Sequence, residues 1–270
     1  MRRIARMSQV LLLTVAAVTL STTAAWAAPV NDDISNATVI STLPFTDRVN
    51  TSDATLVSDD PFTSCFFPAA TVWYTFTPEE SLRVQIDTVG SDFVTTVGVF
   101  TGTPDQLVEV TCNRLLGMGS GVRFDATAGT TYFVMAGTFT RFGGGPVGPG
   151  GNLVLNASVA PPPLTGDVTV NRGTVTNAGT VTMSGTLTCN REGTAMVSLT
   201  LEQRFGRLVA RGGVSNVPMV CGTPWSVQLE PFTAVAFGPG RADATVDLFL
   251  CDPFECVSKQ VTSSVHLRRG

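Results

Sequence analysis

The sequence predicts an all-β protein built from two β-sandwich domains. Apolar and polar residues alternate with a period of two in many short stretches, as expected for strands with one buried face. Val, Thr and Gly are abundant, and no convincing helical stripe follows residue 28, so intrinsic preference agrees with the periodicity. A run of three prolines at residues 161–163 divides the chain into two parts of ordinary domain size. We therefore expect one sandwich over residues 28–160 and a second over residues 164–270, joined by a stiff, extended Pro linker.

The first 27 residues have the organisation of a secretory signal peptide. Three arginines precede the apolar run VLLLTVAAVTL, which is too short to span a bilayer; a membrane anchor is the alternative reading of this run. Ala25 and Ala27 give the A-x-A pattern, which predicts cleavage after Ala27. No second hydrophobic segment follows, so we expect a secreted, extracellular protein without membrane insertion.

The cysteines and the net charge limit the kinds of site and partner that the protein can have. An even number of cysteines in an exported chain predicts disulfides, and no CxxC or Cys/His spacing suggests zinc. The formal net charge is −4 and becomes more negative once the signal peptide is removed. This balance argues against nucleic acid or an anionic membrane as a partner. The six cysteines are Cys65, Cys112, Cys189, Cys221, Cys251 and Cys256.

The strands of the first predicted domain follow from local patterns. SLRVQID (residues 81–87), GVRFDA (121–126) and LVLNAS (153–158) alternate, whereas TYFVMAGTF (131–139) is apolar on both faces and suits a central strand. In TVWYTFTP (71–78), Val72, Tyr74 and Phe76 fall on one face and Trp73 on the other, which suits the interior of a sandwich. The glycine-rich stretch RFGGGPVGPGGN (141–152) opens no helix, so we interpret it as a hairpin loop and not as a phosphate site.

The second predicted domain shows the same period. Val197, Leu199 and Leu201 alternate with polar residues, as do the apolar residues of PWSVQL (224–229). Two cysteines lie at strand ends and two flank a tight DPFE turn, which favours the pairs Cys189–Cys221 and Cys251–Cys256 among the 15 connectivities that six cysteines allow.

Several stretches of the first domain carry a family resemblance when they are read in order. They are NDDISNATVISTLPF (31–45), TVWYTFTPEES (71–81), VGVFTGT (97–103), LVEVTCN (107–113) and GVRFDATAGTTYFVMAGTF (121–139). This order resembles the bacterial pre-peptidase C-terminal domain, which implies a jelly-roll-like sandwich and an accessory role without a catalytic centre. The resemblance also implies a Cys65–Cys112 disulfide. In the second domain the stretches TVTMSGTLTCN (180–190), AMVSLTLEQRFGR (195–207), CGTPWSVQL (221–229) and ATVDLFLCDPFECVSKQV (244–261) together resemble immunoglobulin-like domains of secreted actinobacterial proteins.

Some relatives of the resembled family bind calcium or collagen. Members often carry paired aspartates after the "V-x-C-N" strand end, whereas here Cys112-Asn113 runs into Arg-Leu-Leu. Because calcium needs six or more oxygen ligands, this difference weakens the case for a calcium cofactor. The remaining calcium candidates are Asp32, Asp33, Asp59 and Asp60, and we favour their interpretation as solvated turn residues.

Catalytic chemistry finds little support in the sequence. The only histidine, His266, falls on the polar face of a C-terminal strand, which argues against Ser-His-Asp, Cys-His and histidine–metal sites. Paired carboxylates acting as in glycosidases would make the protein a hydrolase, a remote alternative. Glu79 and Glu80 sit at a turn, and Asp243 and Asp247 are isolated on a strand. We therefore expect that the protein is not an enzyme.

Two non-enzymatic functions remain. The loop DDPFTSCFFP offers Phe62, Phe66 and Phe67 for contact with an extracellular polysaccharide, the cell wall or a protein; the same residues would also serve as a lid over one end of the sandwich. Alternatively, the protein is a small-molecule carrier or purely structural. The C-x4-C hairpin is similar to that of neocarzinostatin-type carriers, and Trp225 and Phe249 would then line a cavity.

Overall fold

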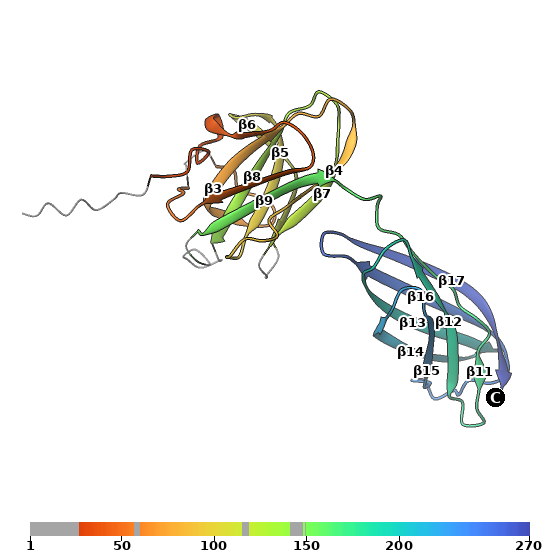
Figure 1. Cartoon of the computed structure of the whole chain (residues 1–270). Helices are drawn as coiled ribbons and strands as arrows, with labels where there is room; N and C mark the ends of the chain where they lie inside the picture. Colours follow the sequence, from red (N-terminus) through yellow and green to blue (C-terminus); the bar gives the residue numbers. More distant parts are fainter. Residues whose placement is uncertain (1–26, 57–59, 115–118, 141–147, 149) are drawn as a thin grey trace, which may run out of the picture.

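The computed structural model describes residues 27–56, 60–114, 119–140, 148 and 150–270 (Figure 1). Within these residues the predicted all-β fold is confirmed: strands make up the regular structure apart from one short 3-10 turn, η1 (Ile34–Asn36). The predicted signal peptide lies outside the described residues except for Ala27. In the part of the chain that is described, no helix is both long and apolar enough to cross a membrane.

The residues before the proline run form two sheets. In the first sheet β1 pairs in parallel with β3 and the other pairs are antiparallel, whereas the second sheet is antiparallel throughout. The first has the order β1 (Thr38–Ile40), β3 (Phe67–Phe76), β8 (Tyr132–Thr140), β5 (Thr96–Thr103), β6 (Gln106–Arg114); the second has the order β2 (Phe45–Asn50), β9 (Asn152–Val159), β4 (Leu82–Asp87), β7 (Gly121–Ala126).

Strand β3 contributes to two hydrophobic cores, one on each face. Val72 and Tyr74 are fully buried among the side chains of β4, β7 and β9, in the core between the two sheets. Trp73 points the other way and is fully buried in a smaller cluster on the outer face of the five-stranded sheet, together with Phe66 and Phe100. The alternation in TVWYTFTP is thus confirmed, and aromatic burial on both faces explains why this strand is so apolar.

The residues after the proline run form a single folded sheet. β11 lies between β12 and β17 and pairs antiparallel with the first and parallel with the second, so it links the strands on either side of it into one sheet. Side chains of β12 and β15 share one core with those of β13, β16 and β17. The order is β10 (Gly166–Val168), β12 (Val181–Cys189), β11 (Thr174–Val175), β17 (Cys256–Arg269), β16 (Gly240–Cys251), β13 (Thr194–Phe205), β14 (Leu208–Met219), with β15 (Pro224–Leu229) paired to β12.

The buried core clusters of the described residues stay on one side of the proline run each. This arrangement is compatible with the predicted division at residues 161–163, which stays a prediction. One interpretation is wrong: the glycine-rich stretch is not a hairpin loop, because β8 and β9 belong to different sheets. Residues 141–147 and 149 of that stretch lie outside the described residues.

Candidate functional site

The loop before β3, residues 60–67, separates the three phenylalanines that the sequence grouped together. We call it the aromatic loop. Phe66 is only 3% exposed and belongs to the outer-face core beside Trp73, so it acts as part of a lid. Phe62 is 71% exposed. Phe67 begins β3, is half-buried, and meets the Phe62 ring edge-to-face at a centroid distance of 5.5 Å. The exposed aromatic surface of this loop therefore centres on Phe62.

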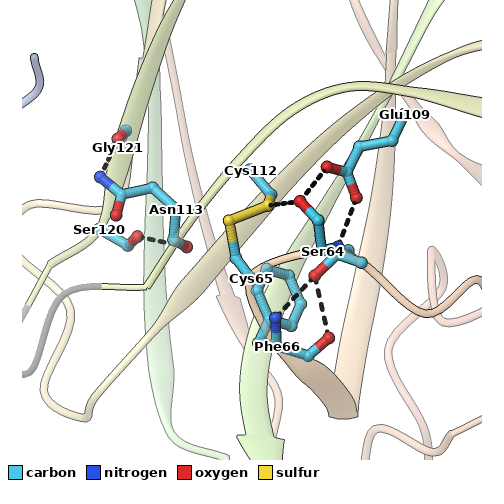
Figure 2. Close-up of a disulfide and its surroundings, with 9 residues drawn as sticks. Ser64, Cys65, Phe66, Glu109, Cys112, Asn113, Ser120 and Gly121 are labelled. Atoms are coloured by element: carbon cyan, nitrogen blue, oxygen red, sulfur yellow. Dashed lines mark hydrogen bonds between the residues drawn. A yellow bond between two sulfur atoms is a disulfide. The ribbon is translucent and has the colours of Figure 1, made fainter.

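A disulfide and a carboxylate fix the middle of the aromatic loop to β6 (Figure 2). Cys65 bonds to Cys112 on β6, which confirms the expected pair. Glu109, also on β6, accepts a hydrogen bond from the Ser64 backbone N–H at 2.8 Å and one from the Ser64 hydroxyl at 2.5 Å. Sequence reasoning missed Glu109 because a single glutamate on a strand carries no signal of its contact 45 residues away.

Shorter-range hydrogen bonds fix the rest of the loop. The Thr63 hydroxyl oxygen accepts from the Phe66 backbone N–H at 2.9 Å and also lies 2.9 Å from the Phe66 carbonyl oxygen. Asp60 accepts from the Thr71 hydroxyl at 2.8 Å and from the Trp73 indole N–H at 2.9 Å. Because both ends are tied to β3 and the middle to β6, the loop presents Phe62 with little conformational freedom.

The described aspartates that were considered as calcium ligands, Asp32, Asp33 and Asp60, accept hydrogen bonds from other residues of the chain. Asp32 accepts hydrogen bonds from the Thr55 backbone N–H and hydroxyl, both at 2.8 Å. Asp33 caps η1, and the hydrogen bond from the Ser35 N–H lowers the pKa of the Asp33 carboxyl. Asp60 bonds to β3 as described, and Asp59 lies outside the described residues. No group of three or more His, Cys, Asp or Glu side chains is arranged for a metal ion among the residues that the structure describes.

The groups considered for catalysis are all exposed. His266 is exposed on β17, as its strand position predicted. Glu79 and Glu80 are exposed at the turn between β3 and β4, and Asp243 and Asp247 are exposed on β16. These positions give the acids no shared buried site in which one carboxyl would be held protonated.

The proposed carrier cavity is not formed by the residues named for it. Trp225 is 6% exposed and belongs to the core of the folded sheet, whereas Phe249 is 51% exposed and alternates with the buried Leu248 and Leu250. Because successive strand residues point to opposite faces, Phe249 faces away from the core that contains Trp225. The hypothesis of a carrier cavity lined by both Trp225 and Phe249 is therefore wrong.

Both remaining disulfides are confirmed, and one of them borders a charged cluster that sequence reasoning missed. Cys189 bonds to Cys221, and Cys251 bonds to Cys256. The DPFE turn between the last pair brings Asp252 and Glu255 against three arginines: Arg83, Arg123 and Arg191. Nothing in the local sequence predicts a contact between residues 83 and 255.

No family model and no curated protein matches the chain. Among solved structures, it is similar to Parabacteroides merdae β-glucuronidase (10% identity, TM-score 0.25, 75% of this chain and 28% of that chain). It is also similar to fibronectin(III)-like modules of Clostridium thermocellum CbhA (14% identity, TM-score 0.27, 72% and 88%) and to a β-galacturonidase from Eisenbergiella tayi (11% identity, TM-score 0.22, 71% and 34%). The chain thus spans about a third or less of the two enzymes, and these similarities assign no family or activity.

Proposed function

We propose that the chain is a secreted, non-catalytic binding protein that contacts an extracellular polysaccharide through Phe62. The observation that carries this proposal is the 71% exposure of Phe62 on a loop fixed by a disulfide. Burying an aromatic ring of this kind stabilises a complex by about 1.5–3 kcal/mol. A preordered loop loses little entropy on binding, so most of that free energy is available for affinity.

The polar groups around Phe62 support a polysaccharide as the partner. Ser64 is exposed and its hydroxyl donates to the Glu109 carboxylate, whose oxygens can each accept a further hydrogen bond from a sugar hydroxyl. A sugar ring has apolar C–H faces and a polar edge, which suits one aromatic platform with a carboxylate acceptor on the neighbouring strand. A stable protein–protein interface needs about 800 Å² from each partner and several apolar anchors, which is more than one exposed ring supplies.

Three further observations support an exported accessory role. The signal-like N-terminus predicts export, and the three disulfides suit an oxidising extracellular compartment. The resemblance of residues 31–139 to pre-peptidase C-terminal domains implies an accessory module beside other secreted activities.

The proposal is tested by sedimenting the mature protein with insoluble polysaccharides, cell-wall material and collagen, with and without calcium. We expect binding to a polysaccharide or cell-wall fraction, and Phe62→Ala should weaken it by about 10- to 100-fold, the equivalent of the ring's burial. Phe232→Ala is the matched control, because Phe232 is also largely exposed, at 67%, but lies between β15 and β16, far along the chain from the aromatic loop.

Equal binding by the Phe62→Ala variant and the wild type would contradict the proposed contact. Binding to collagen alone would show a protein partner instead of a polysaccharide, and no binding to any material would overturn the proposed function.

A further inference from the structure

The turn between β16 and β17, residues 252–255, is held in shape by its own contacts. Asp252 Oδ1 accepts from the backbone N–H groups of Phe254 at 2.8 Å and Glu255 at 2.9 Å, and the Asp252 N–H donates to the Glu255 carbonyl at 2.9 Å. Cys251 and Cys256 are cross-strand neighbours and are joined by a disulfide. The turn therefore projects two carboxylates and one aromatic ring in a defined arrangement.

This turn contacts the four-stranded sheet on the other side of the proline run. Figure 1 shows the end of the β16–β17 hairpin directed towards the part of the chain that contains β4 and β7. Arg83 of β4 lies 2.5 Å from the Glu255 carboxylate, and Arg123 of β7 lies 2.5 Å from Asp252 and 3.3 Å from Glu255. The Arg123 and Asp252 side chains are only 7% and 3% exposed, so this contact is desolvated and depends on both partners.

The Phe254 ring packs so closely against Gly121 of β7 that a side chain at that position would clash with it. Arg123 places its guanidinium carbon 4.9 Å from the centre of the Phe254 ring, a distance suited to a cation–π contact. Two residues before Arg123 on β7, a Cβ atom added to Gly121 would lie 2.4 Å from the ring. The close approach shows that the shape of the turn and that of the sheet are complementary at this point.

The proline linker is part of the same contact. Proline has no N–H, so only the carbonyl groups of this run can form backbone hydrogen bonds. Arg83 donates to the Pro161 carbonyl at 2.9 Å, Arg191 donates to that of Pro162, and Asn190 donates to that of Pro163 at 2.8 Å. Arg191 also contacts both carboxylates of the turn.

We propose that the turn at residues 252–255 is a latch that fixes the residues before and after the proline run in one orientation, and that protonation of its two carboxylates releases this latch. When Asp252 and Glu255 are charged, they balance two of the three guanidinium groups of Arg83, Arg123 and Arg191. When they are neutral, the arginines keep their charge and lose these counterions. Two further acids lie at this site: Asp125 is 91% exposed and lies 3.8 Å from Arg83. Asp87 of β4 is buried beside Gly121 and accepts a hydrogen bond from Gln85, which itself accepts one from Arg123.

The pH range of release follows from the direction of the shifts. Burial raises the pKa of Asp252, but hydrogen bonds from Arg123, from the Phe254 N–H and from Arg191 outweigh it and hold the pKa at about 2, below the usual 3.8. Burial likewise raises the pKa of Glu255, and hydrogen bonds from Arg83 and from the Leu164 N–H outweigh it and place the pKa below the usual 4.5. A lowered pKa means that the closed state gains stability above the usual values and loses it as the pH falls towards 2.

The proposal is tested by small-angle X-ray scattering of the mature protein between pH 7 and pH 2, with circular dichroism to confirm that the strands persist. We expect one compact arrangement at pH 7 and a larger radius of gyration with a broader distance distribution as the pH falls towards 2, the pKa of Asp252. Glu255→Gln and Arg83→Gln should each produce the broader distribution at pH 7. Glu255→Gln removes the acid of this ion pair and Arg83→Gln removes the base, so the test still gives a result if one of the two variants does not fold.

Hydrogen exchange of the Leu164 amide gives a second readout at constant pH. This N–H donates to Glu255 at 2.8 Å, so we expect its exchange at pH 7 to become at least about tenfold faster in Glu255→Gln. Arg204→Gln is the matched control, because Arg204 forms an ion pair with Glu202 away from the junction. The latch is refuted if both junction variants scatter like the wild type at pH 7, or if the folded wild type keeps the same dimensions down to pH 2.

Discussion

Phe66→Ala should destabilise the protein strongly, although the neighbouring Phe62→Ala should not. Phe66 is 3% exposed and packs with Trp73 and Phe100 on the outer face of the five-stranded sheet. Truncation to alanine removes most of a buried ring and leaves a cavity lined by other aromatic side chains, which costs about 3–5 kcal/mol. Because Phe62 is 71% exposed, its truncation should change the free energy of unfolding by no more than about 0.5 kcal/mol.

Urea denaturation followed by circular dichroism measures both values. The two substitutions are chemically identical and lie in the same loop, so their difference isolates burial. Equal losses for the two variants would mean that Phe62 is buried in solution, and the proposed contact surface would then not exist. A loss below about 1 kcal/mol for Phe66→Ala would mean that the loop does not cover the sheet, since a filled core position costs more.

Two further predictions concern the same half of the chain. Replacing Cys65 and Cys112 together by serine opens a loop with a sequence separation of 47, so the free energy of unfolding in urea should fall by about 4 kcal/mol in the chain-entropy description; an unchanged midpoint would contradict this. Burial and the Asp47 carboxylate, 3.0 Å from the Tyr74 hydroxyl, raise the pKa of the Tyr74 phenol above 10.0. Since the unfolded chain then releases this proton first, stability should fall as the pH rises above 10.0, and urea melts at alkaline pH should show a shallower fall in Tyr74→Phe than in the wild type. The same slope in both proteins would refute the protonated, buried phenol.

The local pattern of residues predicted the strands and their buried faces. Val84 and Ile86 on β4, or Leu153 and Leu155 on β9, are buried where the alternation placed them. This succeeds because the period of two is a property of the strand itself and needs no knowledge of the partner strand. The Cys189–Cys221 and Cys251–Cys256 disulfides were predicted from their positions at strand ends and around a tight turn, whereas the Cys65–Cys112 pair was expected only from the family resemblance.

The sequence predicted where the candidate site lies but not which of its phenylalanines is exposed. The sequence identified the aromatic loop, but Phe62, Phe66 and Phe67 are the same residue type within six positions, and no local signal distinguishes the exposed ring from the buried one. That division depends on the outer face of the five-stranded sheet, where Phe66 packs in one cluster with Trp73 and Phe100. It also depends on Glu109, which fixes the loop from another strand.

What the sequence determined by itself is therefore the type of fold and the two disulfides of the C-terminal part, because both depend on residue spacings within and between neighbouring strands. The tertiary structure alone decided which phenylalanine faces the solvent and that Arg83 and Arg123 contact a turn 172 and 129 residues further along the chain. The physical reason is that ion pairs and core contacts depend on distances in space, and the chain path between Arg83 and Glu255 sets that distance only after both sets of strands have packed.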